Sequence, residues 1–347
     1  MIFDKFKNTK VLITGGLGFI GSNLAKELVN LGADVTIIDS LIPDMGGNLF
    51  NISEIKDKVQ LFIKDLRDFD VISKLVKDKD YIFNLAGHLS HVVSMSHPIL
   101  DMELNCKSQL FLLEACRKFN PSVKIIFTGT RAQYGRPLYL PVDEKHPLNS
   151  TDINGINKTA AESYHLLYSK TYGIHISSLR LTNTYGPGHL MNHNKQGFMG
   201  WFIRKAIDNE EITIYGDGKQ IRDFNYVDDV VNALLMTIGH KNSNCEIFNL
   251  GCNERISVYD FADNVIKLSN SGKLEIIPFP KEKKKIEVGD FYNDISKIKE
   301  KIGWEPKINL KQGLTKTLDY YKKYKDMYWW IICNYLIIDN IKSLVID

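Results

Sequence analysis

The chain has 347 residues, 44% of them hydrophobic and 24% charged, so it can bury a large core and is not a disordered protein. Its formal net charge of +3 gives no overall field of the kind that a nucleic-acid-binding protein carries, and we expect the basic run at residues 281–285 to be a solvated loop. The five cysteines form no C-x-x-C pair and the N-terminus lacks the apolar core of a signal peptide, so we expect a cytoplasmic protein in a reducing environment.

Short β-branched runs alternate with amphipathic helical patterns through the first half of the chain. Residues 10–14 (KVLIT) and 34–39 (DVTIID) predict buried strands, and a helical pattern between them closes at Gly32. The series of predicted strands continues at residues 80–87, 123–130 and 174–186. This cadence predicts an α/β fold with a Rossmann-type, doubly wound parallel sheet.

After residue 186 the pattern changes to shorter strands and glycine turns, with helices predicted near residues 198–209, 226–238, 258–268 and 310–324. We therefore expect a dinucleotide-binding Rossmann domain in residues 1–186, completed by parts of 210–250, and an interleaved, smaller substrate lobe in 187–326. Ligands of open α/β sheets bind at the carboxyl edge of the strands, so the site is expected between the lobes.

The C-terminal segment, residues 327–347, is unusually apolar. Its apolar run from residue 327 to 338 is shorter than the ~20 residues that a membrane-spanning helix needs. We expect a segment for packing or for a dimer contact, and no membrane span.

The glycine-rich stretch GGLGFIG, residues 15–21, follows the first predicted strand and opens the first helix, as a dinucleotide-binding loop does. Gly15 permits the tight turn, Gly18 lets a pyrophosphate approach the backbone, and Gly21 allows close packing of helix on strand. Asp39 ends the second strand, where a carboxylate accepts ribose hydroxyls and would repel a 2′-phosphate. The expected cofactor is therefore NAD rather than NADP.

In these residues and in several later motifs the chain resembles the extended short-chain dehydrogenase/reductases, in particular the NAD-dependent nucleotide-sugar epimerase/dehydratase group. The resemblance extends from about residue 10 to about residue 324. Its further motifs are DLRD (65–68), NLAG (84–87), TGTRAQYG (128–135), RLTNTYGPG (180–188) and GDGKQIRDFNYVDD (216–229). It implies tightly held NAD, a nucleotide-diphosphate sugar as substrate, and a homodimer formed through a pair of long helices.

The resemblance also implies roles for individual residues. Thr130 stands where the family has a catalytic hydroxyl that contacts the substrate, Asn183 faces the substrate diphosphate, and the guanidinium of Arg222 grips that diphosphate. The expected cofactor contacts are Gly15, Gly18, Phe19, Ile20, Gly21, Asp39, Ser40, Asp65, Leu66, Leu85, Ala86, Gly87 and Lys158.

Two positions depart from the family pattern. In the family a tyrosine phenol takes a proton from a sugar hydroxyl, and a lysine four residues later lowers the pKa of the phenol and binds the nicotinamide ribose. Lys158 is present here, but Asn154 stands at the tyrosine position, and an amide cannot exchange a proton near neutral pH. Glu287 stands where the family often has a second arginine for the diphosphate, and a carboxylate there would be repulsive unless it is turned away or offset by Lys283 to Lys285.

Three hypotheses remain for the missing phenol. An active oxidoreductase could use another group, such as Thr130, Tyr134, His91 or His88, of which we prefer His88 because it directly follows the NLAG motif. Alternatively Lys158, or a water held by it and the amide, moves the proton. The third hypothesis is a catalytically silent protein that binds NAD and a nucleotide sugar, although such a protein would not require Thr130 and Lys158.

The sequence thus predicts an NAD-dependent nucleotide-sugar epimerase or dehydratase, similar to UDP-glucose 4-epimerase, that acts by transient hydride transfer at a sugar carbon. The alternative enzyme is a sugar-nucleotide reductase or dehydrogenase. No metal is predicted, because the histidine pairs His88 with His91 and His189 with His193 have no cysteine or carboxylate cluster nearby. The usual role of the family that the chain resembles implies a function in polysaccharide or glycan synthesis.

Overall fold

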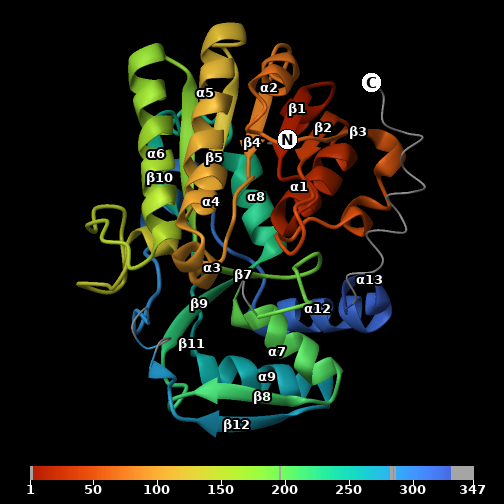
Figure 1. The fold of residues 1–347 in the computed structure, drawn as a ribbon, viewed down its shortest axis with the longest axis vertical. Helices are drawn as coiled ribbons and strands as arrows, with labels where there is room; N and C mark the ends of the chain where they lie inside the picture. The colour runs from red at the N-terminus through yellow and green to blue at the C-terminus, as the bar shows by residue number, and fades with distance from the viewer. Residues whose placement is uncertain (1–2, 195–196, 282–283, 285–286, 330–347) are drawn as a thin grey trace.

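The computed structural model describes residues 3–194, 197–281, 284 and 287–329. Its larger part is a parallel sheet made of β1 (Lys10–Thr14), β2 (Asp34–Asp39), β3 (Val59–Ile63), β4 (Tyr81–Asn84), β5 (Lys124–Thr130), β6 (His175–Leu181) and β10 (Glu246–Asn249). The seven strands lie in the order β10-β6-β5-β4-β1-β2-β3 (Figure 1). The direction of winding reverses between β1 and β4, which confirms the predicted Rossmann-type sheet and marks its ligand-binding edge.

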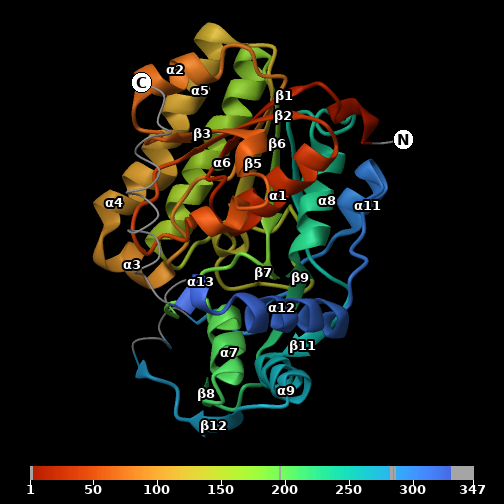
Figure 2. The ribbon, with the colours of Figure 1, turned by 90° about the vertical axis from the view of Figure 1, so that its right-hand side faces the viewer.

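Helices cover both faces of this sheet (Figures 1 and 2). One layer contains α1 (Phe19–Asn30), α8 (Val227–Thr237) and α11 (Ser296–Ile302), and the other contains α2 (Phe69–Leu75), α5 (Ser108–Phe119) and α6 (Ile153–Tyr172). Side chains alternate along each strand, so Val11 and Ile13 pack toward the first layer and Leu12 packs toward the second. Both faces of the strands are therefore apolar, as a buried parallel sheet requires.

The smaller lobe lies across the carboxyl edge of the large sheet (Figure 1). Its three-stranded sheet has the order β11-β9-β7, and its two-stranded sheet pairs β8 with β12. The bounds are β7 (Asn183–Tyr185), β8 (Glu211–Tyr215), β9 (Ile221–Tyr226), β11 (Arg255–Ser257), β12 (Lys273–Ile277), α7 (Phe198–Ile207), α9 (Val258–Ser269), α12 (Leu310–Tyr324) and α13 (Asp326–Trp329). The four helices predicted in this half correspond to α7, α8, α9 and α12. The expected domain boundaries stay predictions.

Two sequence expectations about strands need correction. The run at residues 174–186 is not one strand, because it divides into β6, which belongs to the large sheet, and β7, which pairs with β9 in the lobe. A β-branched run indicates an extended backbone, but it does not indicate which sheet the strand joins. In addition, β3 lies at the edge of the large sheet and was not among the predicted strands.

Several short helical segments lie between the strands or precede the first of them. They are α3 (His91–Ser96), α4 (Pro98–Met102), a π-helical segment (Glu103–Lys107) that leads into α5, and single 3-10 turns at Asp4–Phe6, Leu49–Ile52, Lys56–Lys58 and Arg131–Gln133. The π-helical segment carries Asn105, whose side chain bonds both the N–H and the carbonyl of His88 at 3.0 Å. This contact fixes the loop after β4 at the edge of the sheet.

The start of the apolar C-terminal segment packs on the lobe. Tyr328 and Trp329 are buried, and the indole of Trp329 donates a hydrogen bond of 2.6 Å to Asp208. Residues 330–347 of this segment, and most of the basic run at 281–285, lie outside the described residues. Within the described part of the chain, no helix has the length and apolar character needed to cross a membrane.

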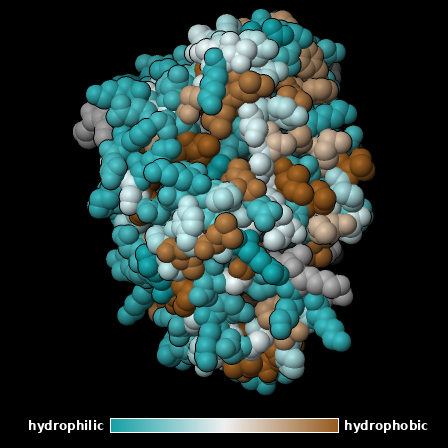
Figure 3. Space-filling view, turned by 90° about the vertical axis from the view of Figure 1, so that its left-hand side faces the viewer, coloured by the Kyte–Doolittle hydropathy of each residue, from teal (hydrophilic) through white to brown (hydrophobic). Residues whose placement is uncertain are grey.

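Large apolar side chains are exposed beside α6. They include Ile99 and Met102 on α4 and Ile156 and Leu167 on α6. Figure 3, which views the molecule from the side on which α6 lies, shows apolar side chains interspersed with polar ones. The homodimer implied by the family resemblance stays a prediction.

Candidate active site

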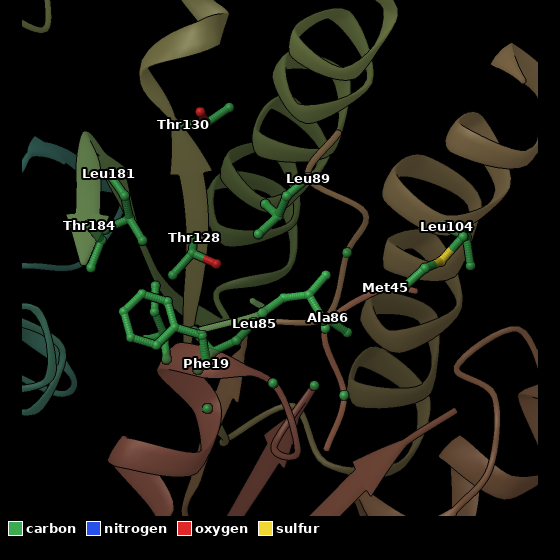
Figure 4. A pocket seen from close by; sticks show the side chains of 18 of the residues that line it. Phe19, Met45, Leu85, Ala86, Leu89, Leu104, Thr128, Thr130, Leu181 and Thr184 are labelled. Atoms are coloured by element: carbon green, nitrogen blue, oxygen red, sulfur yellow. The ribbon is translucent and has the colours of Figure 1, made fainter. Parts of the chain in front are cut away.

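A cavity of about 310 Å³ lies at the carboxyl edge of the large sheet, between the sheet and the lobe. Every cofactor contact expected from the sequence lines this cavity, and so do Thr130 and Asn183. In Figure 4, Thr128 and Thr130 lie at the carboxyl end of β5, while Phe19 and Leu89 come from separate segments around them. The lining also includes residues of the 42–47 loop and of α7, which carry no sequence motif from which a role in the site could be predicted.

The glycine-rich turn fits a dinucleotide. Gly18 is the N-cap of α1 and offers no side-chain hydrogen bond, so the first backbone N–H groups of the helix stay available for an anion. A Cβ atom at Gly21 would collide with the carbonyl oxygen of Gly15. Helix α1 and the glycine-rich turn therefore pack as closely as a dinucleotide-binding loop requires.

Asp39 is held rigidly at the end of β2. Its carboxylate accepts hydrogen bonds from the backbone N–H groups of Leu17 at 3.1 Å and Leu41 at 3.0 Å, and burial raises its pKa. A carboxylate has about four acceptor positions, so further positions remain for ribose hydroxyls. The residues present therefore fit NAD.

Lys158 lies beside Thr128 in the wall of the cavity. It is 2% exposed, its ammonium donates to the Thr128 carbonyl at 3.3 Å, and it lies 5.1 Å from the centre of the Phe127 ring. Burial lowers the pKa of Lys158 to about 8, although the charge of Asp101 opposes this shift. A Cβ atom at Gly87 would lie 2.5 Å from Asn105 Oδ1 and 2.9 Å from the ammonium, so any larger residue there would have to displace these groups.

Asn154 and His88 lie behind the cavity wall rather than in it. Both are buried and neither lines the cavity; the amide of Asn154 donates to the His88 carbonyl at 2.6 Å, and it also donates to Asp101 at 3.3 Å. The ring of His88 bonds Asp101 through Nδ1 at 3.1 Å, and Asn157 donates to the same carboxylate at 2.8 Å. This placement does not support our preference for His88 as the base, and it gives Asn154 a structural role.

Asp101 is the buried carboxylate at the centre of that cluster. Burial is the largest single influence and would raise its pKa, but the hydrogen bonds from His88, Asn157, Asn154 and Asn105 together outweigh it and lower the pKa. The carboxylate therefore stays ionised near Lys158. It ties α4 to α6 and to the loop after β4.

Tyr134, another candidate base, is fully buried away from the cavity. Its hydroxyl donates to Asn249 at 2.6 Å and accepts from Arg180 at 2.7 Å, and burial raises its pKa well above the usual value. A phenol with a raised pKa cannot serve as a base near neutral pH. Tyr134 therefore belongs to the core network that Arg180 and Glu162 complete.

Of the two candidate histidines, His91 is the one that lines the cavity, together with the candidates Thr130 and Lys158. It is the first residue of α3, and its Nδ1 lies 2.7 Å from a carboxylate oxygen of Asp152. The other oxygen of Asp152 accepts from the backbone N–H of Gly155 at 2.8 Å and so caps α6. Because a carboxylate only accepts, Nδ1 carries the proton in the neutral ring and Nε2 is left as the acceptor.

Arg222 does not line the cavity and is already engaged. Its guanidinium pairs with Glu287 at 2.7 Å and also donates to the backbone carbonyls of Ile221 and Gly289. The cations expected to offset Glu287 were Lys283 to Lys285, but the ion pair in the structure is with Arg222, and Lys283 and Lys285 lie outside the described residues. The expected grip of Arg222 on a diphosphate therefore stays a prediction that would require this ion pair to open.

The fold and the cavity together define a dinucleotide-binding enzyme of the short-chain dehydrogenase/reductase type, with a substrate lobe over the cofactor edge. Residues 11–251 match the model of the NAD dependent epimerase/dehydratase family, and the chain belongs to that family. It is therefore an NAD-dependent enzyme of the sugar-nucleotide epimerase/dehydratase kind.

Known relatives resemble this chain over most of its length. A protein of Methanocaldococcus jannaschii provisionally named UDP-glucose 4-epimerase is 37% identical over 315 residues, which are 90% of this chain and 98% of the relative. The UDP-N-acetyl-alpha-D-glucosaminuronate decarboxylase of Bacillus cytotoxicus is 31% identical, covering 90% of this chain and 98% of that one. The crystal structure of UDP-glucose 4-epimerase from Thermotoga maritima with UDP-glucose has a TM-score of 0.83 and 30% identity, covering 91% of this chain and 99% of that one.

Proposed function

We propose that this enzyme is a nucleotide-sugar epimerase that oxidises and reduces one sugar carbon, with His91 as the group that exchanges the hydroxyl proton. The observation that carries the proposal is that His91, which is bonded to the carboxylate of Asp152, lines the same cavity as Lys158 and Thr130. The similarity to proteins named as UDP-glucose 4-epimerases supports the reaction class.

The side chains can perform the proton transfer without a phenol. His91 accepts the hydroxyl proton at Nε2, and Asp152 stabilises the resulting imidazolium through the bond to Nδ1. The buried ammonium of Lys158 adds a positive charge that favours loss of that proton, and the hydroxyl of Thr130 can hydrogen-bond the same sugar oxygen. NAD, when bound, supplies the reversible hydride acceptor. Return of the proton from His91 restores the resting enzyme.

The acid–base groups of the cavity favour an epimerase over a dehydratase. Elimination of water needs a second acid to protonate the departing hydroxyl. Within the described residues, the carboxylates in the cavity lining are Asp39 and Asp65, which the family resemblance assigns to the cofactor. His189 also lines the cavity, but burial lowers its pKa to about 4, so it is neutral and holds no acidic proton of use near pH 7. Among the histidines and carboxylates of this lining, His91 is left to exchange the proton, and the proposal assigns Lys158 to charge stabilisation.

A screen of the purified protein against UDP-, GDP-, CDP- and dTDP-sugars tests the proposal. An epimerase gives a changed sugar with no net change in absorbance at the nicotinamide band. A sugar-nucleotide reductase or dehydrogenase would instead consume or release NADH in proportion to product. Binding of sugars without any turnover would establish the silent-binder hypothesis and overturn the proposal.

Replacing Asn154 by tyrosine is not expected to create a more active enzyme. Asn154 is 1% exposed and donates to the His88 carbonyl and to Asp101, so a larger phenol must displace packed groups. Overpacking a core typically costs about 1–3 kcal/mol. We expect a lower Tm and lower turnover in Asn154→Tyr, while Ile156→Tyr, at a site 53% exposed on the same helix, should keep the wild-type Tm.

A large gain of 4-epimerase activity in Asn154→Tyr would contradict this expectation. It would show that the phenol reaches the cavity and that the asparagine suppresses the conventional reaction. Product analysis with the substrate found in the screen distinguishes the two outcomes.

A further inference from the structure

Arg131 is a cavity residue to which no family motif gives a role. It directly follows Thr130 and begins the 3-10 turn Arg131–Gln133. The backbone of this turn is fixed by a capping box, in which Thr130 and Gln133 bond each other's backbone N–H groups. Arg131 is therefore held one residue away from the predicted catalytic hydroxyl.

The guanidinium of Arg131 has no anionic partner among the residues that the structure describes. It lies over the face of the Phe291 ring, whose centre is 5.4 Å away. Two nearby arginines differ in this respect, because Arg222 pairs with Glu287 and Arg180 pairs with Glu162. The guanidinium of Arg131 is partly buried and forms no ion pair with a described residue, so its N–H groups are open to an anionic ligand in the cavity.

The environment of Arg131 disfavours its charged guanidinium in the absence of a bound anion. Burial, and next to it the positive charge of Arg222, lower the pKa of Arg131 to about 10, which still leaves the group charged at neutral pH. The carboxylates of Glu287, Asp223 and Asp152 oppose this shift from a distance, but none of them forms an ion pair with Arg131. Glu287 is bonded to Arg222, Asp223 accepts from Thr182 and Asn293, and Asp152 is bonded to His91 and Gly155. A bound anion would supply the missing countercharge.

We infer that Arg131 binds an anionic oxygen group of the nucleotide-sugar substrate, either a carboxylate on the sugar or a phosphate oxygen of the diphosphate. A guanidinium presents two parallel N–H groups that match both kinds of oxygen pair. Its position next to Thr130 favours a carboxylate on the sugar as the ligand. Its proximity to Arg222, which is expected to bind the diphosphate, favours a phosphate oxygen. The inference rests on the proposed function, because it names the charge that the substrate carries at this point.

Calorimetric titration of the NAD-loaded protein tests the inference with UDP, UDP-glucose and UDP-glucuronate as probes. Hydrogen bonds to charged groups contribute about 1.5–3 kcal/mol, so Arg131→Gln should weaken the relevant affinity about 10-fold to 150-fold. A loss confined to UDP-glucuronate identifies a sugar carboxylate as the ligand. An equal loss for all three probes identifies the diphosphate. Arg131→Lys should lose part of the affinity, because it keeps the charge but not the planar fork.

Arg117→Gln is the matched control, since Arg117 pairs with Glu114 on α5 and does not line the cavity. Unchanged affinity of Arg131→Gln for all three probes would overturn the inference while leaving the proposed function intact. Failure of the wild-type protein to bind any nucleotide sugar in the screen would overturn both. A retained NAD affinity in Arg131→Gln confirms that the variant is folded.

Discussion

Replacing Lys158 by methionine is expected to lower kcat about a thousandfold while the protein remains folded. The ammonium lies in the cavity wall, where it bonds the Thr128 carbonyl and, by resemblance to the family, the nicotinamide ribose. Preorganised charges in sites that exclude water are typically associated with 100-fold to 1000-fold effects on kcat. Initial rates with the substrate found in the screen measure the loss, and equilibrium binding of NAD should weaken in parallel.

The same variant should change how stability depends on pH. Burial lowers the pKa of Lys158 from 10.5 to about 8, so between these values the unfolded chain binds more protons at this site than the folded one does. Folding stability therefore rises with pH across this window, and the protonated lysine disfavours the folded state at pH 7 by on the order of 3 kcal/mol. Lys158→Met should remove this rise and should not lower Tm at pH 7.

Lys170→Met is the control for both measurements, because Lys170 lies on the same helix and is exposed. It should leave kcat and the pH dependence of stability at their wild-type values. Wild-type turnover should decline as the pH rises through about 8, since the ammonium then loses its proton. Unchanged turnover in Lys158→Met would exclude every mechanism in which this lysine takes part, including the one proposed here.

The cofactor half of the site was predictable because its chemistry is local in sequence. A glycine-rich turn, a carboxylate at a strand end and the segments after β3 and β4 each lie within a few residues of a strand. Parallel strands bring their carboxyl ends together, so a correct fold prediction places these residues in one cavity. The structure adds only the exact contacts, such as the two backbone bonds that hold Asp39.

The acid–base half was not predictable because it depends on contacts between distant segments. His88 and His91 are three residues apart, and the sequence favoured His88 for its position after a motif. In the structure the turn into α3 directs His88 toward Asp101, while His91 meets Asp152, which lies 61 positions further along the chain. Likewise the pairing of Glu287 with Arg222 joins residues 65 positions apart. No pattern within a short stretch of sequence indicates pairs between such distant residues.

His91→Ala is expected to lower kcat by about 100-fold to 10,000-fold, which is the usual range for loss of a positioned general base. His91 lines the cavity and its bond of 2.7 Å to Asp152 leaves Nε2 as the acceptor. His97→Ala is the control, because His97 is exposed just beyond the end of α3 and does not line the cavity. Steady-state kinetics should show the loss in kcat rather than in KM.

Rescue by added imidazole separates a base from a residue that only shapes the cavity. Removing the side chain of His91 leaves space in which a small base can accept the same proton, so millimolar imidazole should restore part of the turnover of His91→Ala. Asp152→Asn should reduce kcat less than His91→Ala does, because the imidazole remains in the cavity. The oxygen of the asparagine can still cap α6, but its NH2 group then faces Nδ1 and favours the wrong tautomer. If His91→Ala kept its kcat within about fivefold of wild type, or lost it without rescue, a different group would have to carry the proton. Lys158 would then be the remaining candidate, and its pKa of about 8 would make a neutral amine available on the alkaline side.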